Sequence, residues 1–120
     1  MPTLRKPKKR PRAKTPTREE RNEVYGTRLW RRLRESHLMQ HPLCEICEAR
    51  GKTVPAVDVH HRDSFLNYEG EMRLEKAYDP ANLMSVCRRC HNWLHRSHRT
   101  QWMTIEAIVE MIKQQENDAK

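Results

Sequence analysis

The clearest pattern of apolar and polar positions lies near the C-terminus. Between Thr104 and Gln115, apolar side chains recur with the i, i+3, i+4, i+7 spacing of one helix face, at Ile105, Ile108, Val109 and Ile112. Thr104 is a suitable N-cap, and Glu106 places a negative charge in the first turn, where the helix dipole favours it. The pattern predicts an amphipathic helix, which we expect to pack on its own domain. An interface with a partner is the alternative.

A second helical pattern precedes Met39. Apolar residues and arginines share it, at Val24, Tyr25, Leu29, Trp30, Leu33 and Leu38, and at Arg28, Arg31, Arg32 and Arg34. The spacing predicts an amphipathic helix that begins at about Glu19 or Thr27, with Gly26 as a candidate interruption. Pro42 ends the helix, because proline disfavours helix in the residue before it. The arginine face either lies on phosphates or is solvated.

The middle of the chain predicts short elements. Residues 56–61 read Ala-Val-Asp-Val-His-His, and their alternation predicts a strand. Residues 62–79 are polar and irregular, and they contain either a second strand or a variable loop. Residues 90–98 suit a short helix. Strands and helices of this kind predict a small α+β fold.

Composition adds a polyanionic partner to this picture. The 120-residue chain has a net charge of +8 and a pI of about 9.7. Seven of its basic residues lie between Arg5 and Lys14, without an acidic residue among them. This proline-rich segment predicts a disordered basic tail over residues 1–18, and the charge favours nucleic acid. The chain has no apolar run of transmembrane length and no signal-peptide core, so we expect a cytoplasmic protein with no membrane partner.

Four cysteines form two equally spaced pairs, C-x2-C-x39-C-x2-C, at Cys44, Cys47, Cys87 and Cys90. This spacing is typical of a structural Zn²⁺ site, in which each pair chelates through a tight turn and both pairs complete a tetrahedron. The alternatives are a redox pair or ordinary buried thiols, which two matched pairs make less suitable. Thiols available for zinc imply a reducing compartment.

The histidines are surplus to that zinc site. His91 and His95 are four residues apart, so on a helix both imidazoles project from one face and can chelate one cation. His60 and His61 end the predicted strand, and Asn82 offers an amide that can hold a loop. We interpret His37, His41 and His98 as incidental.

The order of these residues resembles the HNH endonucleases. Three segments carry the resemblance: Pro42-Leu-Cys-x2-Cys, Val59-His60-His61, and Asn82-Leu-x3-Cys-x2-Cys-His91. It covers about residues 25–97 and is strongest to small phage-type members, so it implies a zinc-stapled ββα-metal core with flanking helices. The expected organisation is the tail, a nuclease domain over residues 19–100 with its N-terminal helix, and a C-terminal helix over residues 101–120 that packs on the domain or on a partner.

The resemblance implies a mechanism. His61 matches the general base, Asn82 the residue that orients it, and His91 a ligand of the catalytic divalent metal. Many members have Asp where this chain has His60, which makes the sequence more similar to the colicin-type nucleases, whose corresponding ligands match His60, His91 and His95. Imidazole ligands make Zn²⁺, Ni²⁺, Co²⁺ or Mn²⁺ suitable beside Mg²⁺.

Two points in that site stay open. Asp58 and Asp63 lie close enough in sequence to add a carboxylate. Adjacent residues of a regular strand point to opposite faces, so His60 and His61 share one site only if the strand ends or bulges there. Without such a break, His60 is expected at the surface or in packing, and His61 in the site.

The resemblance implies hydrolysis of DNA phosphodiester bonds, by nicking or cutting. The alternative is a non-catalytic zinc-knuckle module that binds nucleic acid with its histidines idle. A C2H2 finger is disfavoured, because four residues separate Cys90 from His95 where such fingers use about twelve. The resemblance also implies a phage origin, the host cytoplasm as location, and either the phage terminase, in genome packaging, or a second copy as partner.

Overall fold

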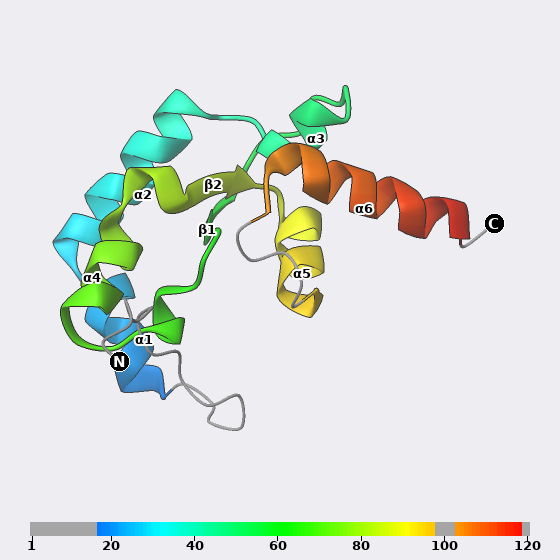
Figure 1. Ribbon diagram of the computed structural model, residues 1–120. Helices are drawn as coiled ribbons and strands as arrows, with labels where there is room; N and C mark the ends of the chain where they lie inside the picture. The colour runs from blue at the N-terminus through cyan, green and yellow to red at the C-terminus, as the bar shows by residue number, and fades with distance from the viewer. Residues whose placement is uncertain (1–16, 98–102, 119–120) are drawn as a thin grey trace, which may run out of the picture.

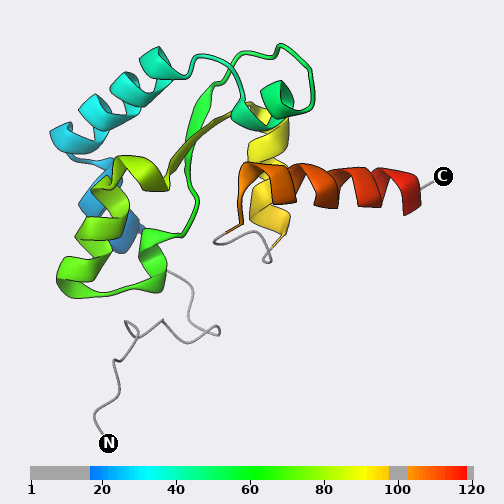
Figure 2. The same ribbon diagram turned by 45° about the horizontal axis from the view of Figure 1, so that its top comes forward.

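The computed structural model describes residues 17–97 and 103–118 (Figures 1 and 2). Along the chain the elements are α1 (Arg18–Tyr25), α2 (Arg28–Gln40), α3 (Glu45–Ala49), β1 (Asp58–His61), the 3-10 turn η1 (Phe65–Asn67), α4 (Gly70–Tyr78), the 3-10 turn η2 (Pro80–Asn82), β2 (Leu83–Val86), α5 (Arg88–Arg96) and α6 (Ile105–Asp118). The predicted tail before Thr17, and His98, lie outside the described residues.

The two strands form a small antiparallel sheet on which the rest of the fold is arranged. β1 pairs with β2 in a regular register, from Asp58 opposite Val86 to His61 opposite Leu83. α5 follows β2 directly, so β1, β2 and α5 make a ββα unit. In both views the strands separate α1, α2 and α4 from α3, α5 and α6 (Figures 1 and 2). The predicted α+β class with a ββα core is confirmed.

The first helical segment is two helices, because two threonines cap two separate starts. The Thr17 hydroxyl accepts a hydrogen bond from Glu20 N, and the Thr27 hydroxyl accepts one from Trp30 N. Gly26 caps the end of α1 between them. Both predicted starts and the interruption at Gly26 therefore correspond to real features of the chain.

Residues 62–79 differ from the expectation of a strand or a loop. They form η1 and α4, and the second strand lies later, over Leu83–Val86. α4 buries Arg73 and Ala77 instead of a run of large apolar residues. A helix that buries an arginine and an alanine has no conventional hydrophobic stripe, so the pattern of apolar positions did not indicate it.

Two apolar clusters lie on either side of the sheet. One contains Val24, Trp30, Val59, Phe65, Ala77 and Leu83. The other contains all four cysteines together with Ile46, Met84, Val86, Leu94, Ile108, Val109 and Ile112. The apolar stripe of α6 thus packs around the cysteines, while the C-terminal end of that helix extends away from the body (Figure 2). Across the described ranges, no helix combines the length and apolar character needed to cross a membrane.

Candidate active site

The four cysteines come together from two distant parts of the chain, one pair at α3 and the other at α5. We call them the cysteine set: Cys44, Cys47, Cys87 and Cys90. Cys44 caps α3 and accepts a hydrogen bond from Cys47 N at 3.5 Å, while Cys87 caps α5. All four are buried, none is in a disulfide, and their Sγ atoms lie within 4.8 Å of one another.

The donor geometry of the cysteine set fits a tetrahedral metal. Cys47 Sγ lies 3.6 Å from Cys90 Sγ and 3.9 Å from Cys87 Sγ. Ligands of a tetrahedral Zn²⁺ with ~2.3 Å bonds lie about 3.8 Å apart. A hydrogen bond from the Cys90 thiol lowers the pKa of Cys44 to about 4, and that same bond raises the pKa of Cys90. Four thiols this close cannot all ionise alone, and a divalent cation removes that conflict.

A second group of candidate ligands lies on the face of β1 opposite to the apolar cluster that contains Val59 and Trp30. We call it the histidine cluster: His60, His91 and His95. The His91 and His95 rings project from one face of α5, and their Nε2 atoms lie 2.9 Å apart. The His60 ring centroid lies 5.3 Å from that of His91 and 5.5 Å from that of His95. Three ring nitrogens, one per residue, lie within 4.8 Å of one another, which suits a shared cation.

Asp58 orients the histidine cluster. The Nδ1–H group of His91 donates to Asp58 Oδ2 at 3.1 Å, which leaves Nε2 of a neutral His91 as the ligand atom. Arg88 Nε lies 3.3 Å from the same carboxylate oxygen. Of the two candidate carboxylates, Asp58 and Asp63, Asp58 therefore lies beside the site and supports His91. Asp63 lies elsewhere, buried in a network with Asn82.

Burial favours the uncharged form of two members of the histidine cluster, His60 and His95. Burial, followed by the positive charges of His91, His95 and His61, lowers the pKa of His60 to about 3. Burial, followed by the charge of His91, also lowers the pKa of His95. Neutral imidazoles are the ligands of divalent transition metals, so the lowered pKa values of His60 and His95 suit these two residues to that role.

His61 lies on the opposite face of β1. The strand has a regular register without a bulge, and it alternates so that His60 is half-buried and His61 is 6 % exposed. The His61 ring stacks on Trp30 with a centroid distance of 4.8 Å. The expectation that His60 lies at the surface or in packing applied to a strand that continues past this point, and β1 ends at His61. It is His60 that joins His91 and His95, because α5 covers the face of β1 from which Asp58 and His60 project.

A backbone carbonyl determines the tautomer of His61. His61 Nε2 lies 2.9 Å from Ala77 O in the last turn of α4. A carbonyl only accepts hydrogen bonds, so Nε2 carries the proton and Nδ1 of the neutral ring carries the lone pair. Burial lowers the pKa of His61, and the hydrogen bond to Ala77 partly offsets this. The ring is therefore uncharged at neutral pH and can accept a proton at Nδ1.

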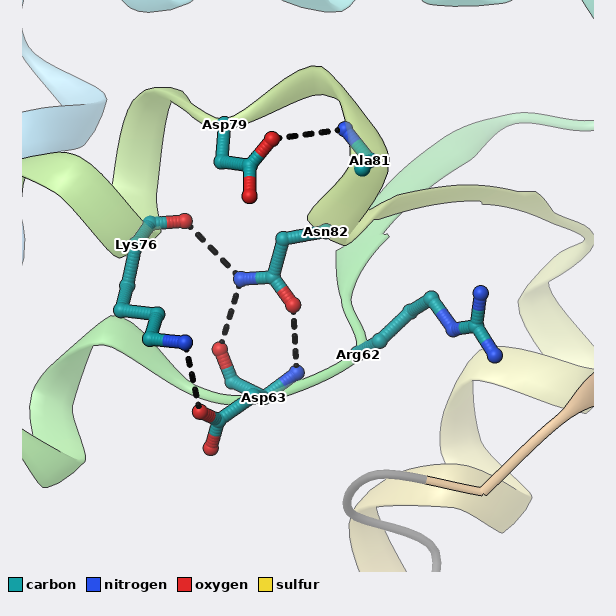
Figure 3. Close-up of a pocket in the computed structure, with 6 residues that line it drawn as sticks. All are labelled: Arg62, Asp63, Lys76, Asp79, Ala81 and Asn82. Atoms are coloured by element: carbon teal, nitrogen blue, oxygen red, sulfur yellow. Dashed lines mark hydrogen bonds and ion pairs between the residues drawn. The ribbon is translucent and has the colours of Figure 1, made fainter. Parts of the chain in front are cut away.

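Asn82 joins Asp63 to Lys76 of α4, as Figure 3 shows. Its Oδ1 accepts from Asp63 N at 2.8 Å, and its Nδ2 donates to Asp63 O at 2.8 Å and to Lys76 O at 2.9 Å. Lys76 precedes Ala77, so the amide of Asn82 holds the turn of α4 whose next carbonyl binds His61. The Tyr68 hydroxyl and Lys76 Nζ meet the Asp63 carboxylate at 2.5 Å and 3.7 Å.

Comparisons with known proteins match this arrangement. Residues 44–97 match the model of the HNH endonuclease family. The crystal structure of an HNH endonuclease from the deep-sea thermophilic bacteriophage GVE2, solved with a manganese ion, matches with a TM-score of 0.60 and 28 % identity. That match covers 71 % of this chain and 88 % of the phage protein. Residues 44–97 are an HNH endonuclease domain. A search of curated proteins found no match.

The HNH family decides between the two functions that the sequence left open. The chain is a nuclease that acts on DNA, and the non-catalytic zinc-knuckle alternative is set aside. Within the HNH domain, the sequence left open whether Asp58 adds a carboxylate to the site. Sequence reasoning also missed the Ala77 carbonyl, because a backbone atom leaves no signal in the residue pattern. The stacking of Trp30 on His61 was likewise hidden, since Trp30 fits an ordinary helical stripe.

Proposed function

We propose that the histidine cluster holds the catalytic divalent metal of this nuclease and that His61 is its general base. The observation that carries the proposal is the placement of the histidines on the two faces of β1. His60, His91 and His95 converge on one face, while the adjacent His61 has its proton held at Nε2 on the other. His61 is also close enough that its charge lowers the pKa of His60.

The roles of the chain's own groups follow from their hydrogen bonds. His61 accepts a proton at Nδ1 from the attacking water, and the Ala77 carbonyl keeps the ring in the tautomer that can do so. Asn82 holds the α4 turn that supplies this carbonyl, so it is a positioning residue. Asp58 holds the His91 ring toward the cluster. A divalent cation bound there would stabilise negative charge on the scissile phosphate and the leaving 3′ oxygen.

Substrate binding is proposed to use the basic residues beside this site. Arg88 pairs with Asp58 through Nε, yet its side chain is 73 % exposed. An exposed guanidinium one turn from His91 suits a phosphate of the DNA backbone. Such contacts read no sequence, so we expect little sequence preference from this part of the chain.

The native metal and the biological setting belong to the same proposal. The phage endonuclease was solved with manganese, and three imidazoles also suit Ni²⁺, Co²⁺ and Zn²⁺ beside Mg²⁺. We propose a phage-encoded enzyme that works with the terminase in genome packaging in the host cytoplasm, where the thiols of the cysteine set stay reduced. A double-strand break needs two active sites, so we expect it to require a second copy or a partner enzyme. Stimulation of cleavage by purified terminase tests that partnership.

A plasmid-nicking assay with metal titration tests the assignment of the histidine cluster. The double variant H91A/H95A should lose Mn²⁺-stimulated nicking while the cysteine set keeps its zinc. Asn92→Ala is the matched control, because Asn92 is exposed on the same helix, α5, and should leave nicking unchanged. Metal-stimulated nicking by H91A/H95A at the wild-type rate would remove the cluster as the catalytic metal site.

A further inference from the structure

A third group of metal ligands lies away from both sites described above. His37 and His41 are four residues apart at the C-terminal end of α2, and Glu45 is the first residue of α3. One ligand atom from each of the three lies within 4.8 Å of the others. We call this group the α2–α3 triad. The pattern of apolar and polar positions did not indicate that His37 and His41 lie beside Glu45. The two histidines were expected to be incidental.

Contacts within the triad orient the side chains that would bind a metal. His37 Nε2 lies 3.0 Å from Glu45 Oε2, and the His37 and His41 ring centroids lie 4.8 Å apart. The same Glu45 oxygen accepts a hydrogen bond from Ser85 N in β2 at 2.6 Å, which fixes the carboxylate. Within the part of the chain that the structure describes, the other Glu45 oxygen and the His41 ring nitrogens make no hydrogen bond. A carboxylate only accepts, so His37 Nε2 donates to Glu45, and the lone pair of the neutral His37 ring is on Nδ1. The three residues therefore each keep a lone pair for a cation.

The surroundings favour a positive ion. The carbonyl end of α2 carries the partial negative charge of the helix dipole, and Glu45 adds a full negative charge. His37 and Glu45 are half-buried while His41 is exposed, so an ion has a path from solvent to a partly desolvated site.

We propose that the α2–α3 triad binds a first-row transition-metal cation of the Zn²⁺, Ni²⁺ and Co²⁺ class. Two imidazole nitrogens and one carboxylate oxygen form the protein ligand set, and water completes the coordination. Mg²⁺ and Ca²⁺ prefer all-oxygen sites, so the two imidazoles select against them. This ion is separate from the zinc of the cysteine set and from the catalytic metal.

The triad connects three parts of the nuclease. An ion there links the end of α2 to α3, which carries Cys47, and through Glu45 and Ser85 it supports β2. Binding to the folded state alone raises stability by mass action. Added metal should therefore raise the melting temperature of the protein without changing its cleavage chemistry.

Calorimetric titration of the full chain with Ni²⁺ tests the proposal. The background is H91A/H95A loaded with one equivalent of zinc, which fills the cysteine set, and its histidine cluster has lost two ligands. It should bind one Ni²⁺ per chain beyond the zinc, and the further change His41→Ala should weaken that binding by about tenfold or more, since even groups that only support a ligand contribute that much. Gln40→Ala, beside His41 on α2, is the matched control and should leave the affinity unchanged.

Two results would overturn the triad as a metal site. One is the absence of any Ni²⁺ bound beyond the zinc in the H91A/H95A background. The other is Ni²⁺ binding that His41→Ala leaves intact, which would locate the ion elsewhere. A melting temperature that rises with Ni²⁺ in this background, but not after His41→Ala, supports the site by a readout independent of cleavage. The outcome is also independent of the nicking assay, so failure here leaves the catalytic assignment standing.

Discussion

The cysteine set and the histidine cluster are two groups of candidate metal ligands, and they differ in what surrounds them. All four cysteines are buried among the apolar residues of α3, β2, α5 and α6. The histidine cluster is only partly buried, with His95 exposed, and charged groups lie beside it. A ligand set closed inside a core holds elements together, whereas one open to solvent leaves coordination positions for a substrate.

α5 carries ligands for both sites on different faces. Cys90 and Leu94 are buried in the apolar cluster, while His91 and His95 face β1. Neighbouring residues on a helix point about 100° apart, so this short helix presents the two groups of candidate ligands on different faces. Removing one group of ligands at a time tests whether the cysteine set and the histidine cluster have different roles.

The largest expected effect is on stability, from loss of the cysteine set. Cys90→Ala should abolish cooperative thermal unfolding, because structural zinc contributes ~10–16 kcal/mol in small zinc peptides and a domain's net stability is about 5–15 kcal/mol. H91A/H95A should keep the transition. Circular dichroism melts of both variants measure this contrast. A Cys90→Ala protein that melts like the wild type would mean that the cysteines are ordinary core residues.

A smaller effect is expected from the support of the histidine cluster. Asp58→Ala should weaken Mn²⁺ binding by about 10- to 100-fold, because the His91 ring loses the carboxylate that orients it. Zinc content should stay unchanged. Glu48→Ala, an exposed acidic residue on α3, controls for the loss of a negative charge. Titration of metal-stimulated nicking gives the apparent affinity, and equal affinities in the two variants would exclude Asp58 from this role.

The smallest effect concerns pH. The folded-state pKa of His60 is lowered to about 3 by burial and by its histidine neighbours, so the unfolded chain binds a proton at His60 below pH ~6.5 that the folded chain does not. Stability from this group is therefore complete above pH 6.5 and is lost as pH falls toward 3. Urea unfolding of zinc-loaded protein at pH 7.5 and 5.5 should show a decline that is about 1 kcal/mol smaller in His60→Ala. Equal declines would mean that His60 titrates normally.

The sequence predicted the features that depend on spacing. The two C-x2-C pairs, the i, i+3, i+4, i+7 stripe of α6 and the caps around Gly26 are local patterns, and each corresponds to an element in the structure. The order of cysteines and histidines was sufficient for the family, because the HNH pattern is itself a matter of residue types at intervals.

The remaining features depend on contacts between distant segments. No pattern indicated α4, since it buries Arg73, whose Nε donates to Tyr68 O. The choice between His60 and His61 depended on which face of β1 the α5 helix covers, and this is a tertiary fact. The joining of Glu45 to His37 required the turn between α2 and α3.

The central claim is that the adjacent histidines of β1 have different tasks, His60 toward the metal and His61 as base. Single-turnover nicking of plasmid DNA by His61→Ala at saturating Mn²⁺ tests it most directly, with Mn²⁺ affinity, zinc content and the thermal melt measured on the same sample. The account predicts a rate lowered by about 10²- to 10⁴-fold, the usual contribution of a general base, with Mn²⁺ affinity retained. A rate within tenfold of the wild type in a folded, metal-binding variant would contradict it.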